Sequence, residues 1–220
     1  MNGRMPSRAE MNAALEERHG KILQKKFEKA VIVICGLGGL GSNIATVLAR
    51  AGVGKLILID FDKVDITNLH RQQYKAAQIG MFKTDAMTEN LKEIAPYTIV
   101  RTYNVKITEE NLKEVLLCNE EIGKADVICE AFDDAATKAM LVNYILTAMP
   151  DKYLVTASGM AGMGSANAIH TRKVMKRFYL CGDEVSDVSE TIGLVASRVM
   201  ICAAHQAHMV LRILAGQYDV

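Results

Sequence analysis

A glycine-rich segment carries the first residues in this chain whose types and spacing could do chemistry. Gly36, Gly38 and Gly41 have the spacing G-x-G-x-x-G and follow directly on the apolar run Val31–Cys35. Such glycines let the backbone turn sharply and approach a phosphate, and the following helix presents free N–H groups and the positive end of its dipole. The segment, which includes Gly39, therefore predicts a nucleotide-binding turn, and a purely structural turn is the alternative.

Two acids follow the next apolar run at 55–60. Asp60 lies about 20 residues beyond the glycines, where an acid hydrogen-bonds a ribose hydroxyl in nucleotide-binding folds. Capping of the next loop is the alternative for Asp60. Asp62 could contact the ribose or a metal ion, or be a simple loop acid.

Polar residues after these acids are suited to phosphate. Arg71 is a permanently charged, forked donor that matches phosphate oxygens, and Asn68 and Gln72 lie beside it. Lys83 begins a predicted helix, where a cation opposes the helix dipole, so a phosphate is its expected partner. Surface salt bridges are the alternative for Arg71 and Lys83. These donors favour an exposed triphosphate over a nicotinamide.

Two carboxylates, Asp133 and Asp134, follow an apolar run that ends at Glu130. Open α/β sheets bind ligands at the carboxyl ends of their parallel strands, and carboxylates near a triphosphate normally hold Mg²⁺. The alternative is N-capping of the helix that begins at Ala135, and the two roles are compatible.

Short apolar strands that alternate with helices must position these residues. The pattern predicts strands at 31–35, 55–60, 99–105, 125–130, 153–157, 167–173 and 178–181, and helices at 7–29, 42–51, 83–94, 108–117, 135–148 and 193–216. This order predicts one α/β domain over residues 1–220. Its fold should be Rossmann-like, with a mostly parallel sheet flanked by helices and additional strands in the C-terminal third.

Composition narrows the class of protein. The chain has 220 residues, half of them hydrophobic, and a net charge of +1, which gives no reason to expect nucleic acid or a membrane as partner. No signal peptide is evident, and charged and polar residues interrupt the C-terminal apolar run. The five cysteines are widely spaced without a C-x-x-C pair, which favours a cytoplasmic protein and argues against a four-cysteine zinc site.

Several motifs in one order resemble the ubiquitin-activating-like superfamily. The resemblance rests on Gly-Leu-Gly-Gly-Leu-Gly-Ser at 36–42, Asn-Leu-His-Arg-Gln at 68–72 and Glu-Ala-Phe-Asp-Asp at 130–134. Within that superfamily the chain looks most like the sulfur-carrier adenylyltransferases of the ThiF/MoeB/HesA family, in particular a short ThiF-like branch. The matching motifs cover residues 31 to about 140.

This resemblance implies a set of roles. ATP would lie over the glycine turn with Gly39 near the phosphates, and Asp60 would hold the ribose. Asp133 would bind Mg²⁺ with Asp134 beside it. Phosphates would be bound by Asn68, Arg71 and Lys83. The C-terminal Gly-Gly carboxylate of a ubiquitin-like carrier would attack the α-phosphorus, in the service of thiamine thiazole synthesis, molybdopterin synthesis or another thiolation pathway.

The resemblance also implies a homodimer, with residues 1–29 as an N-terminal helical segment, 30–157 as the nucleotide-binding core and 158–220 for carrier binding and dimerisation. Relatives carry an arginine that reaches the partner's ATP, and here Arg18 or Lys21 is nearest to that position. Relatives often bind zinc through paired cysteines, which this chain lacks, so no zinc is expected. Cys181, in a polar setting, is the candidate for a carrier-accepting thiol, with a packing thiol as the alternative.

Two other classes of function are compatible with parts of the sequence. An NAD-dependent oxidoreductase would use the glycines and Asp60 but has no natural role for Arg71, Lys83 and Asp133. A non-catalytic module that docks a ubiquitin-like protein is favoured only by the weak match around Arg18.

Overall fold

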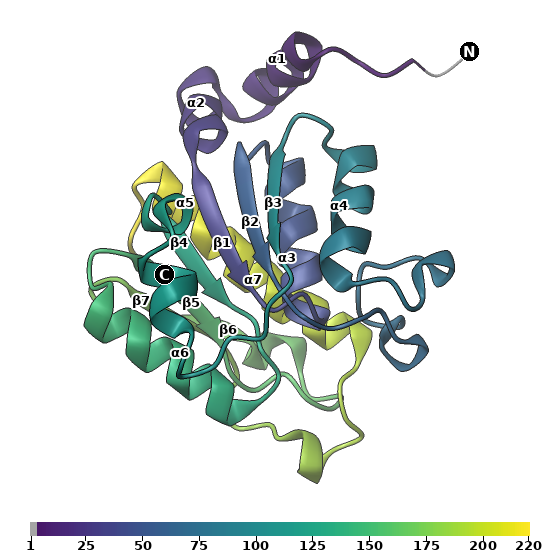
Figure 1. The fold of residues 1–220 in the computed structure, drawn as a ribbon, viewed down its shortest axis with the longest axis vertical. Helices are drawn as coiled ribbons and strands as arrows, with labels where there is room; N and C mark the ends of the chain where they lie inside the picture. The colour runs from purple at the N-terminus through teal and green to yellow at the C-terminus, as the bar shows by residue number, and fades with distance from the viewer. Residues whose placement is uncertain (1–3) are drawn as a thin grey trace.

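Seven strands form one sheet in the computed structural model, which describes residues 4–220 (Figure 1). The strands are β1 (Val31–Cys35), β2 (Lys55–Ile59), β3 (Ile99–Tyr103), β4 (Val127–Glu130), β5 (Tyr153–Ala157), β6 (His170–Met175) and β7 (Phe178–Gly182). Their order is β3-β2-β1-β4-β5-β7-β6. All neighbouring pairs are parallel except β7 and β6, so the predicted mostly parallel sheet is confirmed.

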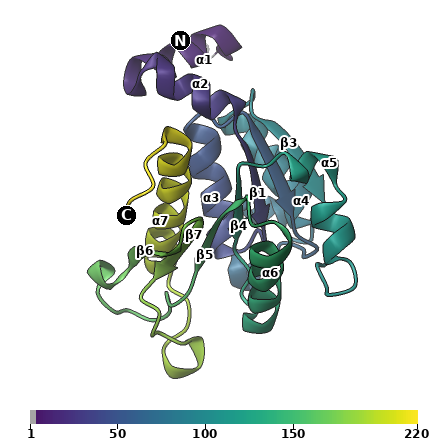
Figure 2. The same cartoon turned by 90° about the vertical axis from the view of Figure 1, so that its left-hand side faces the viewer.

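Helices cover both faces of the sheet (Figure 2). The α-helices of the described residues are α1 (Arg8–His19), α2 (Lys21–Lys29), α3 (Gly39–Arg50), α4 (Lys83–Ile94), α5 (Glu120–Gly123), α6 (Ala135–Ala148) and α7 (Ala196–Ala215). Of these, α1 and α2 lie beyond the amino end of β1 rather than on a face (Figure 1). Helices α3, α4 and α7 share one hydrophobic cluster with the sheet, and α5 and α6 share the other. The chain therefore has the three-layer Rossmann-like α/β arrangement that its sequence predicts.

The central strand β1 explains why its sequence is continuously apolar. Successive strand residues point to opposite faces, so Ile32 and Ile34 lie in the cluster with α3 and α7, and Val33 and Cys35 lie in the cluster with α6. All four are completely buried. A strand covered on both faces needs an apolar side chain at every position.

The strand order of the sheet reverses at β1. This strand pairs with β2 on one side and with β4 on the other, so the chain leaves β1 in one direction and returns on the opposite side. A crevice forms beyond the carboxyl ends of strands at such a point and is where open α/β sheets bind ligands. Gly36, Asp60 and Ala131 directly follow the ends of β1, β2 and β4, so they lie at this edge of the sheet.

Two helix predictions differ from the structure. Gly20, with φ of +90°, breaks the predicted helix 7–29 into α1 and α2, and Ser7 is the N-cap of α1. The predicted helix 108–117 is instead a turn followed by one turn of π-helix at Lys113–Leu117. The Asn111 side chain accepts from the Thr108 N–H and donates to the Lys106 carbonyl, which offers the backbone an alternative to a regular helix start.

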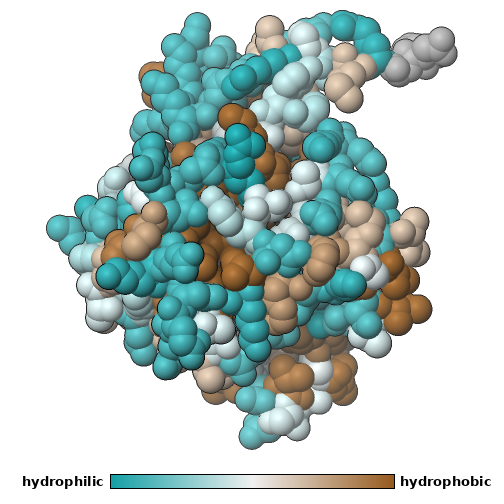
Figure 3. Space-filling view, in the orientation of Figure 1, coloured by the Kyte–Doolittle hydropathy of each residue, from teal (hydrophilic) through white to brown (hydrophobic). Residues whose placement is uncertain are grey.

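Hydrophilic residues cover much of the face in Figure 3, and the apolar residues there form separate groups. Within residues 4–220 no helix has the length and apolarity needed to span a bilayer. The division into 1–29, 30–157 and 158–220 stays a prediction, and its residues 1–3 lie outside the described part of the chain.

Candidate nucleotide site

The glycine turn between β1 and α3 is packed too tightly against other backbone for side chains at two of its positions. A β-carbon at Gly41 would lie 1.8 Å from the Gly36 carbonyl oxygen, and one at Gly36, whose φ is +94°, would lie 2.7 Å from the Ala131 carbonyl oxygen. At Gly38 the nearest atom would be 3.8 Å away, so this position is open. Gly38 is also the N-cap of α3 and offers no side chain to its N–H groups. The turn therefore leaves room and donors for an anion.

Asp60 lies beneath this turn and is nearly buried. Its Oδ2 accepts the Leu37 N–H at 2.5 Å and its Oδ1 accepts the Asp62 N–H at 2.7 Å. Burial raises the pKa of Asp60, although Lys83 and the two N–H donors lower it. The carboxylate thus ties the end of β2 to the glycine turn, and each oxygen keeps a lone pair for a further donor.

Lys83 forms an ion pair with Asp62, with 2.8 Å between Nζ and Oδ2. Lys83 is buried, whereas nearly half of the Asp62 side chain is exposed. The Lys83 N–H also donates to the Asp62 carbonyl at 2.9 Å, which places the start of α4 beside the acid. The salt bridge that the sequence left as an alternative for Lys83 is therefore present.

Arg71 and Asn68 meet beside the glycine turn. The Arg71 Nη2 donates to the Asn68 Oδ1 at 2.7 Å, and its Cδ lies 3.5 Å from the position of a β-carbon on Gly39. Burial lowers the pKa of Arg71, and the nearby charge of Asp133 raises it. Because the residue is only half-buried and charged at any ordinary pH, its remaining donors can face a ligand in the crevice.

Two buried polar atoms at this place have no partner in the described part of the chain. They are the Arg71 Nε and the Gln72 Oε1. The Gln72 Nε2 is the atom nearest to a β-carbon at Gly38. Buried polar groups are rarely left unpaired. The Arg71 Nε is a donor and suits an anion, whereas the Gln72 Oε1 is an acceptor and needs a donor. The cradle and the donor set fit a triphosphate.

Asn43 is a site residue that the sequence reasoning missed. Its Nδ2 donates to the Gly39 carbonyl at 2.6 Å and to the Arg71 carbonyl at 3.1 Å, and its Oδ1 accepts from Gln73. Asn43 therefore fixes Arg71 against the glycine turn. Its position in the first turn of α3, one residue after the glycine motif, was the only available signal.

The two carboxylates after β4 have different settings. Asp134 is the N-cap of α6 and accepts the Thr137 N–H at 2.7 Å, which is the capping alternative that its sequence suggested. Asp133 is exposed and lies near enough to Arg71 to affect its pKa. Residues 4–220 contain no group of three His, Cys, Asp or Glu side chains able to hold a metal. Mg²⁺ on a nucleotide needs only one or two protein carboxylates, so Asp133 fits this ion.

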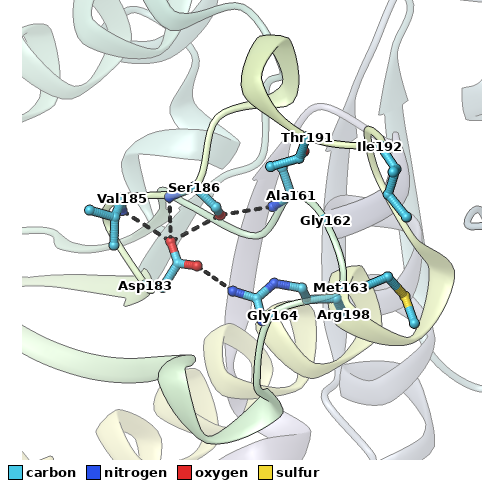
Figure 4. A pocket seen from close by; sticks show the side chains of 10 residues that line it. All are labelled: Ala161, Gly162, Met163, Gly164, Asp183, Val185, Ser186, Thr191, Ile192 and Arg198. Carbon is cyan, nitrogen blue, oxygen red and sulfur yellow. Dashed lines mark hydrogen bonds and ion pairs between the residues drawn. The ribbon is translucent and has the colours of Figure 1, made fainter.

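A cavity of about 420 Å³ lies in the C-terminal third of the chain (Figure 4). One wall is the Ala161–Gly164 segment after β5 and the other is the loop between β7 and α7. Arg198, at the start of α7, lines it, and the next residue, Val199, packs against Gly39. The cavity and the glycine turn therefore share one wall.

Cys181 does not lie in a polar loop, so that expectation of its setting is wrong. It is fully buried in β7, paired with Ala157 of β5, and burial raises its pKa to about 12. Thr171 lies 3.5 Å from its Sγ and also bonds His205, which is half-buried at the other side of the hydroxyl. A buried, protonated thiol is a packing group rather than a nucleophile.

Arg18 and Lys21 are exposed at the junction of α1 and α2. Both helices lie beyond the amino end of β1, whereas the crevice lies at its carboxyl end (Figure 1). Neither side chain can therefore serve the nucleotide site of its own chain.

The chain matches one protein family and is similar in sequence to curated proteins. The model of the family described as the ThiF family matches residues 10–220. The "Adenylyltransferase and sulfurtransferase UBA4" of Lodderomyces elongisporus is 28% identical over 201 residues, which are 89% of this chain and 42% of that protein. The "Adenylyltransferase and sulfurtransferase MOCS3" of Caenorhabditis briggsae is 31% identical over 149 residues, 67% of this chain and 35% of that protein. The chain thus spans less than half the length of these curated relatives.

Solved structures share the fold. The E. coli tRNA N6-threonylcarbamoyladenosine dehydratase TcdA in complex with ATP superposes with a TM-score of 0.83 at 21% identity, covering 97% of this chain and 98% of that one. E. coli MccB with ATP gives a TM-score of 0.69 at 23% identity, covering 90% and 59%. At these identities the likeness establishes the fold of the chain.

Proposed function

Because the chain belongs to the ThiF family, we propose that it is an adenylyltransferase that uses ATP to activate the C-terminal Gly-Gly carboxylate of a ubiquitin-like sulfur carrier. The observation that carries the proposal is the open position at Gly38 beside the Gln72 Nε2, together with the unpartnered Nε of Arg71, whose side chain lies next to Gly39. Two structural neighbours are complexes with ATP, and the curated relatives are named adenylyltransferases, which supports the same chemistry.

The proposed reaction is the attack of a carrier carboxylate oxygen on the α-phosphorus of ATP. A bond forms between that oxygen and phosphorus, the bond to the β-phosphate oxygen breaks, and pyrophosphate leaves. The reaction needs no nucleophile from the enzyme. The protein contributes position and positive charge, and these two effects account for most of phosphoryl-transfer catalysis.

Each residue has a part in this proposal. Asp60 holds the ribose, and the glycine turn and the N-terminus of α3 bind phosphate. Arg71 neutralises charge on the phosphates, with Asn68 holding its guanidinium at 2.7 Å. Asp133 would hold Mg²⁺, which when bound supplies further positive charge at the phosphates.

Lys83 takes part as a second cation at the edge of the site. Its partner Asp62 is the more exposed of the two, so a phosphate that approaches can compete for the ammonium group. Gln72, through its Nε2, and Asp134 complete the site as a phosphate donor and as the cap that holds α6.

The cavity beside Gly39 is the proposed channel for the carrier tail. A Gly-Gly tail is narrow, and the channel wall at Ala161–Gly164 has only small side chains apart from Met163. The hydrophobic side chains of Val185 and Ile192 are largely exposed at its rim. They offer an apolar surface for the body of the carrier.

A homodimer is part of the proposal. Helix α1 has no buried residue, and α7 leaves half of Met200 exposed. Arg18 or Lys21 would act at the site of the other copy, since each lies far from its own. Sedimentation equilibrium that returns twice the chain mass of 24.1 kDa would support it, and a monomer at micromolar concentration would contradict it.

The pathway is proposed as thiamine thiazole synthesis, with molybdopterin synthesis or another thiolation pathway as alternatives. All five cysteines are free thiols, which supports a cytoplasmic location. A dinucleotide oxidoreductase is disfavoured because it leaves Arg71 and Asp133 without a role.

Pyrophosphate exchange tests the proposal. The protein is incubated with ATP, labelled pyrophosphate and each of several small carriers, and label should enter ATP only when the carrier is present. The control is the same carrier without its last two glycines, which should give background exchange. Absence of carrier-dependent exchange with every carrier, together with binding of NADH but not ATP, would overturn the proposal in favour of an oxidoreductase.

A further inference from the structure

Glu130, the last residue of β4, is a fully buried acid that the proposed chemistry does not use. Its Oε1 accepts the Phe132 N–H at 2.7 Å and the Lys138 Nζ at 2.8 Å. Its Oε2 accepts the Lys138 Nζ at 2.7 Å and the Thr156 hydroxyl. A buried carboxylate is tolerated only when it is paired and hydrogen-bonded, and Glu130 satisfies both conditions with partners from three segments.

The same carboxylate holds the turn that carries Asp133. Residues 131–134 connect β4 to α6, and the Phe132 N–H anchors the start of this turn on Glu130. Asp134 anchors its end by capping α6. The Ala131 N–H donates to the Cys35 carbonyl at 2.8 Å, which ties the turn to the end of β1. Because the turn 131–134 is short and is anchored at both ends, the position of Asp133 depends on these anchors.

Helix stability alone does not account for the Glu130–Lys138 pair. Lys138 lies at the beginning of α6, where a positive charge opposes the helix dipole. A buried ion pair often gives no more stability than well-packed apolar residues of the same volume. The Glu130 carboxylate instead holds the turn through the Phe132 N–H, and Lys138 holds that carboxylate.

We propose that Glu130, held by Lys138 and Thr156, is a positioning residue that fixes Asp133 opposite Arg71 and so sets the affinity of the site for a nucleotide–Mg²⁺ complex. This inference rests on the proposed function, because that function assigns the metal to Asp133. Groups behind a metal ligand commonly change metal affinity by about 10- to 100-fold when they are replaced.

The test measures binding rather than turnover. A non-hydrolysable ATP analogue is titrated calorimetrically at a series of Mg²⁺ concentrations, with thermal unfolding recorded in parallel. Glu130→Gln should raise the Mg²⁺ concentration for half-maximal binding about 10-fold. Thr156→Val removes one donor and should raise it about 3-fold. The control Glu93→Gln, which removes the exposed ion pair with Lys75, should leave it unchanged.

Each outcome decides the inference. Glu130→Gln protein that binds nucleotide at wild-type Mg²⁺ concentrations overturns it, even if its unfolding temperature falls, because a merely structural role predicts that result. Wild-type binding that is independent of Mg²⁺ also overturns it. If Glu130→Gln does not fold, Thr156→Val decides by the same criterion. If the variants show these shifts in Mg²⁺ concentration but the wild-type protein shows no carrier-dependent exchange, the proposed function is refuted and the positioning role of Glu130 is kept.

Discussion

The Asp183 carboxylate and the Arg198 guanidinium form an ion pair that leaves 7% and 5% of their side chains exposed. Asp183 follows β7 and Arg198 begins α7, so the pair closes the loop that lines the cavity (Figure 4). Arg198 also donates to the Ser165 carbonyl at 2.7 Å, which joins the other cavity wall. Burial raises the pKa of Asp183, but hydrogen bonds from Ser186, Val185 and Arg198 together outweigh burial and leave it below 3.8.

The stabilising effect of this pair should depend on pH. Since the folded-state pKa of Asp183 is lowered, the pair stabilises the protein fully above the unfolded-state pKa of 3.8, and this is lost as pH falls through the lower folded-state value. Asp183→Asn should be less stable by about 3 kcal/mol at neutral pH. Urea unfolding of both proteins at stepwise lower pH should show the difference shrink below pH 3.8. A difference that stays constant would contradict this account.

Alanine substitution at two glycines of the turn should affect different properties, stability at Gly41 and ATP affinity at Gly38. Gly41→Ala places a methyl group against the Gly36 carbonyl oxygen and should destabilise the fold by about 3 kcal/mol. Gly38→Ala has room for its methyl group and should unfold at the wild-type temperature. Because that methyl group occupies the phosphate cradle, ATP affinity should fall about tenfold. Calorimetric ATP titration and thermal unfolding of both variants check this, and unchanged ATP affinity in Gly38→Ala argues against a phosphate there.

Arg71 should matter for its forked shape as well as its charge. Arg71→Met should lower carrier-dependent pyrophosphate exchange about 100-fold, the loss typical of one removed electrostatic donor. Arg71→Lys keeps the charge but cannot reproduce the two-pronged contact, so a loss of about 10-fold is expected. Arg50→Met, at the exposed end of α3, is the matched control. Equal effects at positions 50 and 71 would refute a role for Arg71 at the phosphates.

Thiol labelling should separate Cys118 from the other cysteines. Cys118 is exposed, whereas Cys35, Cys129, Cys181 and Cys202 are buried. One thiol per native chain should react rapidly with a disulfide reagent, and five should react in denaturant. Cys181→Ala should keep exchange at the wild-type rate, since a thiol with a pKa of about 12 takes no part in it. Rapid labelling of Cys181 in the native protein would show that this packing role is wrong.

The sequence predicted those features that depend on neighbouring residues in the chain. The strand Val31–Cys35 and the glycine turn were predictable because burial on both faces and tight backbone contact select residue types directly. The buried setting of Cys181 was not, although its strand was predicted. Gly182 and Asp183 suggest a polar surrounding, while pairing with Ala157 holds the thiol in a fully buried part of the sheet. The hydrogen bonds to Glu130 were not predictable either. They come from Lys138 of α6 and Thr156 of β5, which only the folded chain brings together.

The position of β1 has a consequence for how the chain is made. Its first neighbour, β2, follows shortly after it, but its second neighbour, β4, is synthesised only when the chain reaches Glu130. Until then a strand that will be central has one open hydrogen-bonding edge, and such edges promote aggregation. The nucleotide crevice is equally late, because Asp133 comes after β4. A chain that stops before Val127 would carry the glycine turn, Asp60 and Arg71 but neither β4 nor the carboxylate of Asp133.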